Sequence, residues 1–379
     1  MSPKRRVLFL LSSFTQGGAQ RHLLELMRSL DPSRFELAIC ALNRTNHFGA
    51  DLPAGEPRYV MGGPVYWNPV AFVNLVGALR RFQPDILHCY MNDGNLWGRL
   101  ASRLWRPRAV LTSVHLDDMA PVHRFWERRL HPLSDRIVAH SRSIERFLVT
   151  ELGVPAQKVT VIVNGVDVAR FRAVDAALRA AARAQLGHAP EQFLAVMAAR
   201  IAEQKNQDLV IEAVAALRGR GMLPEGFRLL LAGTISSHAL SRKIDRLIGE
   251  HRLEQHVLRL GAVKDMQSLY AAADVVLLPS RTEASPIAAL EALSVGIPVL
   301  ISDTSNTDQV VVPGQHGWQV RANDPAELEA ALGEILTTSR TELERLGRAG
   351  RAHVQAHFTN QAVAQAFTRL YDEVAPPSG

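Results

Sequence analysis

Two glutamates in the second half of the chain could act on a sugar. Glu283 and Glu291 bound the stretch Glu283-Ala-Ser-Pro-Ile-Ala-Ala-Leu-Glu291. Within it, Ser285 is a favourable N-cap and Pro286 a favourable first helical residue, so we expect a helix with Ile287 in its first turn. Its N–H groups and positive dipole end could hold a diphosphate, with one carboxylate facing a sugar and the other a ribose. An ordinary amphipathic helix with a surface glutamate is the alternative.

Two cations follow an apolar run that is typical of a buried strand. Arg200 and Lys205 lie in the loop after Phe193–Ala198. The planar fork of arginine and the compact charge of lysine both suit phosphate oxygens, so the pair can converge on one diphosphate. Stabilising a departing nucleoside diphosphate is the main electrostatic task of sugar transfer from a nucleotide sugar. A solvated loop is the alternative.

A glycine pair follows the first apolar run. Gly17 and Gly18 stand in Gln16-Gly-Gly-Ala-Gln-Arg21, directly before apolar residues at helical spacing. Glycine lets the backbone approach a phosphate or sugar closely, although such pairs are common in ordinary loops. The stretch lacks the G-x-G-x-x-G fingerprint, which disfavours a nicotinamide-dependent dehydrogenase.

A histidine beside two carboxylates follows another apolar run. His115, Asp117 and Asp118 come after Val110–Val114. The imidazole could hydrogen-bond a sugar hydroxyl or help to deprotonate an acceptor, although a lone loop histidine is more often structural. We interpret His88, inside an earlier apolar run, as a core or rim histidine. The sequence has no metal-ligand cluster and no D-x-D motif, so we expect no metal.

The apolar runs alternate with helical segments, which is typical of parallel strands covered by helices on both faces. The expected strands are Val7–Leu11, Leu37–Leu42, Ile86–Tyr90, Val110–Val114, Arg136–Ala139, Thr160–Val163, Phe193–Ala198, Arg228–Ala232, Val257–Leu260, Val275–Leu278 and Val299–Ser302. The expected helices include Leu75–Arg81, Ser143–Leu152, Ala176–Leu186, Asp208–Arg218 and Leu240–Glu250.

The alternation is interrupted by the turn at Asn164-Gly165 and then starts again. We therefore predict an α/β fold of two Rossmann-like domains, residues 1–164 and 165–357. Ligands bind beyond the carboxyl ends of strands in open α/β sheets, so the two domains should face a central cleft. The amphipathic segment 358–379 should be a helix that crosses back to the first domain.

Positive charge is concentrated in the first part of the chain. Residues 1–165 carry 21 Lys and Arg against 13 Asp and Glu, a net charge of +8 in a chain whose total is +6. This excess indicates a phosphate-bearing acceptor, an anionic membrane surface or simply a solvated arginine-rich surface. Aromatic residues are sparse and no nucleic-acid motif occurs, so nucleic acid is not an expected partner.

Export and membrane insertion are not expected. The first apolar run is shorter than a signal peptide requires, and no run approaches the ~18 residues of a membrane span. Cys40 and Cys89 lie in apolar runs without partner or ligand spacing, which fits reduced thiols. We expect a cytoplasmic protein, with peripheral attachment to the inner face of the plasma membrane as the variant that the basic first half suggests.

Taken in order, these motifs resemble those of the family 4 retaining glycosyltransferases, which have the GT-B fold. The two glutamates are similar to the family's E-x7-E pair, and the two cations of the loop at 200–205 to its diphosphate-binding Arg/Lys pair. Asn164-Gly-Val-Asp167 resembles the N-G-V-D interdomain turn, and Gly17 opens a stretch that resembles the G-G-A-E-R loop. Val263 falls where the family's backbone commonly holds the nucleotide base.

The resemblance implies a metal-independent, retaining transfer of a hexose from a UDP- or GDP-type sugar, with no separate cofactor. The acceptor would be a glycan or lipid-linked species in bacterial surface polysaccharide, lipopolysaccharide or glycoconjugate synthesis. The N-terminal domain would bind the acceptor and the C-terminal domain the nucleotide sugar. Arg200 and Lys205 would bind the diphosphate, Glu291 the ribose and Glu283 the donor sugar. The remaining contacts would come from Gly18, beside the diphosphate, and His115, beside the sugar or acceptor.

Some positions depart from the family pattern and leave the donor sugar open. Ala284-Ser285 stands in place of Gly-Phe, Gln20 in place of Glu, and Ser305-Asn306 in place of Gly-Gly, while Thr234 stands where a second glycine is usual. Two other functions fit the motifs: a soluble transferase or phosphorylase acting on free sugars, and a non-catalytic nucleotide-sugar-binding protein.

Overall fold

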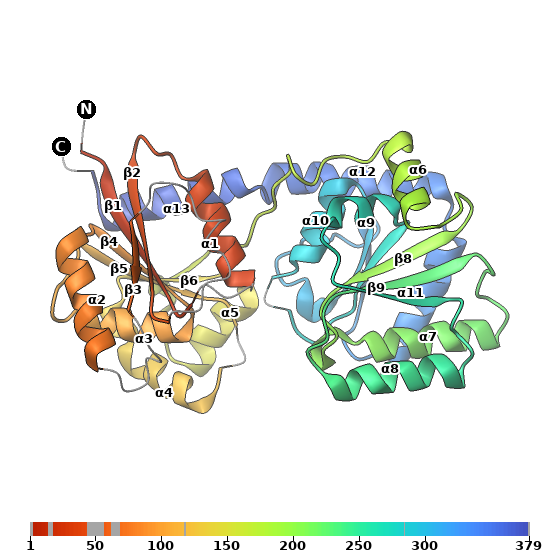
Figure 1. Cartoon of the computed structure of the whole chain (residues 1–379), viewed down its shortest axis with the longest axis horizontal. Helices are drawn as coiled ribbons and strands as arrows, with labels where there is room; N and C mark the ends of the chain where they lie inside the picture. Colours follow the sequence, from red (N-terminus) through yellow and green to blue (C-terminus); the bar gives the residue numbers. More distant parts are fainter. Residues whose placement is uncertain are drawn as a thin grey trace. The chain divides into compact units, whose positions relative to one another are not determined.

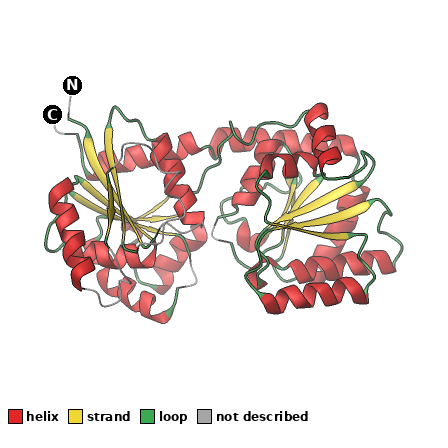
Figure 2. Cartoon of the chain, viewed as in Figure 1, coloured by secondary structure: helices red, strands yellow, loops and turns green. Residues whose placement is uncertain are grey.

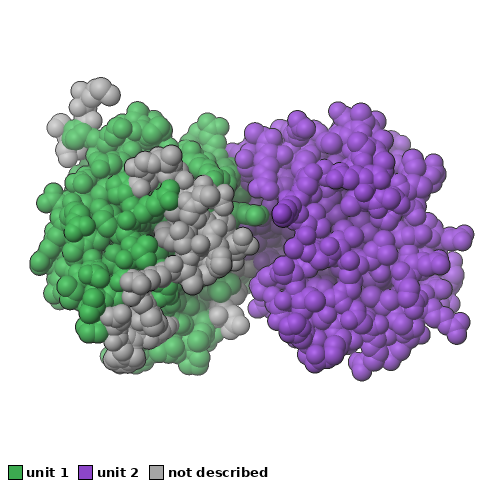
Figure 3. Space-filling view, viewed as in Figure 1, with its two compact units in different colours: residues 1–165, 360–379 green, residues 166–359 purple. Residues whose placement is uncertain are grey.

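The chain forms two compact units in this computed structural model (Figure 3). Unit 1 comprises Met1–Gly165 and Asn360–Gly379, and unit 2 comprises Val166–Thr359. The structure describes residues 3–13, 18–43, 57–61, 69–116, 119–283 and 285–377. No helix in these ranges has both the length and the apolar character of a membrane span.

Unit 1 is built on one parallel sheet. Its strands are β1 (Arg5–Leu11), β2 (Phe35–Ala41), β3 (Arg58–Val60), β4 (Ile86–Tyr90), β5 (Ala109–Val114), β6 (Arg136–Ala139) and β7 (Val159–Val161). They lie in the order β3-β2-β1-β4-β5-β6-β7, so the direction of strand addition reverses between β1 and β4. This reversal is the topological switch point of a doubly wound fold.

Side chains of β1 alternate between the two faces of this sheet. Val7, Phe9 and Leu11 belong to one buried cluster, and Leu8 and Leu10 belong to another. Both faces are therefore buried, which is why the strand reads as a continuous apolar run. The helices that cover the sheet are α1 (Gly18–Ser29), α2 (Pro69–Phe82), α3 (Met91–Ala101), α4 (Pro121–Leu130), α5 (Arg142–Arg146) and α13 (Asn360–Val374) (Figures 1 and 2).

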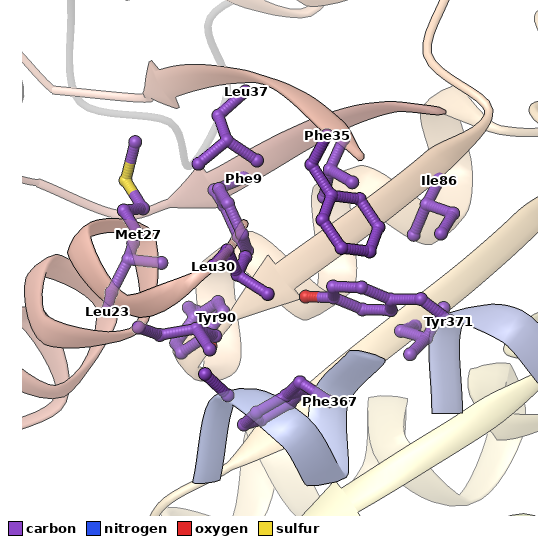
Figure 4. Close-up of a cluster of buried hydrophobic side chains, with 14 of the residues drawn as sticks. Phe9, Leu23, Met27, Leu30, Phe35, Leu37, Ile86, Tyr90, Phe367 and Tyr371 are labelled. Carbon is purple, nitrogen blue, oxygen red and sulfur yellow. The ribbon is translucent and has the colours of Figure 1, made fainter. Parts of the chain in front are cut away.

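The last helix completes the core of unit 1, although it is far from the sheet in sequence. Phe367 and Tyr371 of α13 are fully buried and face Tyr90 and Phe35 in one cluster (Figure 4). The hydroxyl of Tyr371 lies 2.8 Å from Nδ1 of His88. The C-terminal helix is thus an integral part of the first unit.

Unit 2 repeats this architecture. Its strands are β8 (Phe193–Ala198), β9 (Phe227–Ala232), β10 (Val257–Gly261), β11 (Val275–Leu278), β12 (Val299–Ser302) and β13 (Gly317–Val320), all parallel, in the order β10-β9-β8-β11-β12-β13. Its helices are α6 (Ala176–Gln185), α7 (Gln207–Gly219), α8 (His238–Glu250), α9 (Met266–Ala272), α10 (Ile287–Val295), α11 (Pro325–Thr337) and α12 (Arg340–His357). The prediction of two Rossmann-like domains is confirmed.

Truncating the aromatic anchor of α13 should destabilise unit 1. Phe367→Ala should lower the free energy of unfolding by about 3–5 kcal/mol, because a fully buried phenyl ring leaves a cavity. Urea unfolding followed by tryptophan fluorescence measures this change. Gln365→Ala, at an exposed position of the same helix, is the control and should change the value by less than ~0.5 kcal/mol. Equal stability of both variants would show that α13 does not contribute to this core.

Candidate active site

The loops that carry the predicted donor-binding residues meet at the switch point of unit 2. β8 pairs with β11, and the order of strands reverses between them. Arg200 and Lys205 follow β8, and Glu283 follows β11. Loops at the carboxyl ends of such a strand pair splay apart and leave room for a ligand.

An ion pair joins these two loops. The ammonium of Lys205 contacts the carboxylate of Glu283, and the side chains are 15% and 20% exposed. The structure therefore brings together the predicted diphosphate-binding cation and the predicted sugar-binding carboxylate. At this partial burial the pair is shielded from bulk water and still accessible to a ligand.

Asn206 fixes the geometry of the same loops. Its backbone adopts the left-handed conformation (φ 55°), which asparagine tolerates better than most residues. Its side-chain amide donates to the carbonyl of Pro279 at 2.8 Å and accepts from Nε of Arg281 at 2.7 Å. The N–H of Arg281 donates to the carbonyl of Gln204 at 2.8 Å. Asn206 is almost completely buried, so these bonds form a rigid base under Lys205.

Arg200 is directed to the loop after β9. Its guanidinium donates to the hydroxyl of Ser236 at 2.9 Å, and its side chain is exposed. This loop approaches closely because Gly233 has φ 155° and a Cβ there would lie 2.1 Å from the carbonyl oxygen of Ala199. From the loop after β8, Arg200 therefore contacts the loop after β9, and Lys205 contacts the loop after β11.

The start of α10 differs from the prediction. The helix begins at Ile287, and Pro286 is its N-cap, with ψ 65°. The expectation that Ser285 caps this helix and Pro286 is its first residue is wrong, because the non-helical ψ of Pro286 moves the helix start by one position. Among the described residues, no hydrogen-bond partner is found for the buried Oγ of Ser285. Ala284, between Glu283 and Ser285, lies outside the described residues.

The second glutamate of the pair is buried at the middle of α10. Glu291 is 6% exposed and accepts a hydrogen bond of 2.9 Å from the hydroxyl of Tyr270 in α9. This bond fixes the orientation of the carboxylate. Val263, the predicted base contact, lies just after β10 at the same edge of the sheet and is partly buried.

In unit 1, Gly18 begins α1 close to the other switch point. Gln20 of this helix contacts the carbonyl of Ser13, after β1, and the sulfur of Met91, after β4, each at 3.4 Å. The helix therefore spans the two strands between which the order reverses. Gly17, Asp117 and Asp118 lie outside the described residues.

His115 belongs to a cluster of imidazole rings, which we call the histidine cluster (His22, His88, His115 and His140). His115 stacks on His140 with 4.0 Å between ring centroids, and His22 meets His140 edge-on at 4.7 Å. Burial lowers the pKa of His22 to about 4 and of His88 to about 3, and it lowers those of His115 and His140 well below the ordinary value. The cluster is thus neutral at physiological pH, so His115 can accept a hydrogen bond there.

Unsatisfied nitrogen atoms mark this cluster. Among the described residues, no hydrogen-bond partner is found for either ring nitrogen of His22 or for Nε2 of His115 and His140. Buried polar atoms are usually paired, so those of His115 and His140, at the carboxyl ends of β5 and β6, are candidates for contact with a polar ligand.

Five residues of these two sites were not predicted from the sequence. They are Asn206, Arg281 and Tyr270 in unit 2, and His22 and His140 in unit 1. His140 directly follows an expected strand, so the rule that selected His115 also applies to it. The role of Asn206 could also have been predicted, because asparagine tolerates the left-handed backbone conformation that strand-to-helix loops often need. Arg281, Tyr270 and His22 have no comparable sequence signal, since their roles depend on tertiary contacts.

The described residues contain no group of three or more His, Cys, Asp or Glu side chains arranged to hold a metal ion. The residues predicted for the unit 2 site are Arg200, Lys205, the two glutamates and the tip of α10. Such an arrangement can bind a pyrophosphate and stabilise charge that develops on it.

Both halves of this chain are similar in sequence to known protein families. Residues 16–170 match the family described as Glycosyltransferase Family 4, and residues 179–353 match Glycosyl transferases group 1. The chain is 31% identical over 285 residues to D-inositol 3-phosphate glycosyltransferase of Nocardia farcinica, which covers 71% of this chain and 62% of that relative. The chain thus spans less than two thirds of the length of that relative.

Two further comparisons concern a bacterial relative and a solved structure. The chain is 25% identical over 263 residues to the Escherichia coli UDP-Gal:alpha-D-GlcNAc-diphosphoundecaprenol alpha-1,3-galactosyltransferase, covering 67% of each. The crystal structure of Anabaena HepE in complex with UDP superposes with a TM-score of 0.83 at 20% identity, covering 97% of this chain and 100% of that one. At this identity the superposition establishes the shared fold.

The two units and these matches define a transferase with the GT-B fold. The chain belongs to the family 4 glycosyltransferases.

The histidine cluster should make the protein sensitive to acid. Below about pH 6.5 the unfolded chain takes up protons on these imidazoles, whereas folded His22 stays neutral until about pH 4, so stability falls across this interval. At pH 5, His22 alone should account for about 2 kcal/mol of the loss. Urea unfolding at pH 7.5 and 5 measures it.

His22→Phe should remove that part of the pH dependence, because a phenyl ring fits among the surrounding aromatic rings and takes up no proton. His251→Gln, at an exposed position, should leave the loss unchanged. An identical pH dependence for wild type and His22→Phe would refute the prediction.

Proposed function

We propose that this glycosyltransferase moves a hexose, with retention of configuration and without a metal, from a nucleotide-diphosphate sugar to a glycan or lipid-linked acceptor. The product would contribute to a bacterial surface polysaccharide or glycoconjugate. The observation that carries this proposal is the convergence of Lys205 and Glu283 at the switch point of unit 2, beside the start of α10. Cation, carboxylate and helix tip are the groups that a sugar-linked diphosphate requires.

Unit 2 would bind the donor. Lys205 and Arg200 would stabilise the negative charge that develops on the departing diphosphate, and the start of α10 (Ser285, Pro286 and Ile287) would lie against it. The carboxylate of Glu283, next to Lys205, would contact the sugar. The buried carboxylate of Glu291, oriented by Tyr270, would accept hydrogen bonds from the ribose, and Val263 would lie near the base.

Unit 1 would bind the acceptor. Gly17 and Gly18 would bring the backbone near the diphosphate and sugar. His115 would contact the sugar or the acceptor hydroxyl through its buried Nε2, in the neutral state that burial favours. A neutral imidazole can accept a hydrogen bond from a hydroxyl, which fits orientation of the sugar or the acceptor.

The name of the Escherichia coli relative supports a lipid-linked acceptor, since it refers to a diphosphoundecaprenol substrate.

The basic first part of the chain supports a second element of the proposal, which is peripheral attachment of a cytoplasmic enzyme to an anionic inner membrane surface. Recovery with membranes at low salt and release at high salt would support this attachment, because salt screens exposed charges.

Removing the ammonium of Lys205 should abolish most of the transfer. Lys205→Ala should lower kcat/KM by about two orders of magnitude, equivalent to ~3 kcal/mol of transition-state stabilisation. The measurement uses a panel of UDP- and GDP-hexoses, with nucleoside diphosphate release and labelled glycoside formation on a bacterial lipid extract as separate readouts. Wild-type kcat/KM in this variant would refute the assignment.

Lys243→Ala is the matched control, because it removes another lysine–carboxylate ion pair of the same unit, that with Asp208. It should retain full activity. Nucleoside diphosphate release without any glycoside in the wild type would indicate hydrolysis, and tight donor binding without turnover would indicate a binding protein.

A further inference from the structure

A cavity of unit 2 lies away from the predicted donor site. It has a volume of about 510 Å³, within the range of small-molecule sites. Asp274, directly before β11, and Pro298, directly before β12, line it, so it opens at the amino ends of the strands. The predicted donor site lies at the carboxyl ends of the same strands. The cavity is therefore a separate place on the molecule, and we call it the arginine pocket.

Positive charge is in excess in the arginine pocket. Its lining includes five arginines, namely Arg179, Arg183, Arg340, Arg348 and Arg351, and three carboxylates, namely Asp175, Asp274 and Glu344. The lining thus carries two more positive than negative charges.

The carboxylates are largely occupied by other contacts. Asp274 pairs with both Arg179 and Arg183, while Asp175 accepts the N–H of Leu178 at the start of α6. Glu344 lies 3.8 Å from Arg348 in an exposed pair. One buried carboxylate therefore serves two guanidinium groups.

Other arginines of the pocket contact main-chain oxygens. Arg340 donates to the carbonyl of Pro190 at 3.2 Å, and Arg351 donates to the carbonyls of Phe171 and Ser294. These contacts satisfy donors but neutralise no full charge. The positive charges of Arg340 and Arg351 are thus available to an anion.

The like charges act on one another. Burial lowers the pKa of Arg179, and the nearby charges of Arg183 and Arg340 lower it further, against the opposing effect of Asp274. An anion beside Arg179 and Arg340 would relieve this repulsion.

The remaining wall is apolar. Val174, Val295, Ile297, Pro298 and Leu343 line the pocket beside the arginines. A ligand that fills the volume therefore needs a carbon skeleton as well as an anionic group. An excess of two positive charges matches a phosphate monoester, which carries about −1.5 to −2 at pH 7, better than a single carboxylate.

We propose that the arginine pocket binds a phosphate monoester carried on a largely apolar skeleton, with Arg179 and Arg340 holding the phosphate. The ligand could come from a soluble organic phosphate or from a lipid whose headgroup is a phosphate monoester. The site is independent of the donor site and of the reaction proposed for it.

Binding of phenyl phosphate to the full-length protein, measured by titration calorimetry, tests the site. Arg340→Gln should weaken binding about tenfold or more, since it removes a charge-assisted contact at an exposed residue whose loss should not affect folding. Arg345→Gln is the matched control, because Arg345 lies on the same helix, pairs with Glu342 and does not line the pocket. It should bind like the wild type.

Lys205→Ala separates this site from the donor site. Phenyl phosphate binding that persists in Lys205→Ala and is lost in Arg340→Gln supports the proposal, even if no transfer activity is ever found. Absence of binding, or binding that Arg340→Gln leaves unchanged, overturns it. Inorganic phosphate bound as tightly as phenyl phosphate would overturn the assignment of an apolar skeleton.

A vesicle assay distinguishes the two sources. Sedimentation with phosphatidylcholine vesicles that contain phosphatidic acid, dependent on Arg340 and absent with phosphatidylcholine alone, assigns the site to a lipid headgroup. Binding of phenyl phosphate without such sedimentation assigns it to a soluble phosphate.

Discussion

The ion pair of Lys205 and Glu283 forms where two neighbouring parallel strands send their loops in opposite directions. Loops that leave a sheet in opposite directions diverge, which would separate the cation proposed to bind the diphosphate from the carboxylate proposed to bind the sugar. Asn206 holds the two loops together, because its buried side chain forms hydrogen bonds with both the carbonyl of Pro279 and the guanidinium of Arg281. The cost of its left-handed backbone is offset by these bonds, and the proposed donor site depends on the geometry that they impose.

The two units use the same switch-point geometry with different electrostatics, charged in unit 2 and neutral in unit 1. In unit 2 the loops present full charges that suit a diphosphate. In unit 1 the corresponding edge of the sheet carries the histidine cluster, whose burial keeps imidazoles neutral. A neutral cluster of hydrogen-bonding rings suits the hydroxyl groups of a sugar, and it avoids a second concentration of positive charge. The division of roles proposed for the two units follows from this difference in charge.

Most of the fold follows from local pattern, whereas the site needs tertiary contacts. The bounds of β8, β11 and β12 agree with the apolar runs, because strands buried on both faces need a continuous apolar sequence. α3 starts at Met91, directly after β4 and without a side-chain cap, so it lacks the start signal that sequence reasoning uses. The observed start of α10 is one residue later than the predicted start for a related reason. A Ser-Pro pair predicts that the serine is the cap, but the loop around Pro286 determines its ψ angle. The contact of Glu291 with Tyr270 joins two helices and has no signature in either.

α10 runs between the two ends of the strands at which unit 2 is proposed to bind anions. The helix is largely buried, and its nine residues span roughly 13 Å, so its ends are the parts that reach the opposite edges of the sheet. At its start, the positive end of the dipole favours a diphosphate. At its other end, Val295 and Gly296 line the arginine pocket, where the negative end of the dipole would by itself repel an anion. Arg351 offsets this by bonding the carbonyl of Ser294, and the other arginines reverse the sign of the local charge. Cations at a helix C-terminus need only match a partial charge, so the surplus at this pocket exceeds what the stability of α10 requires.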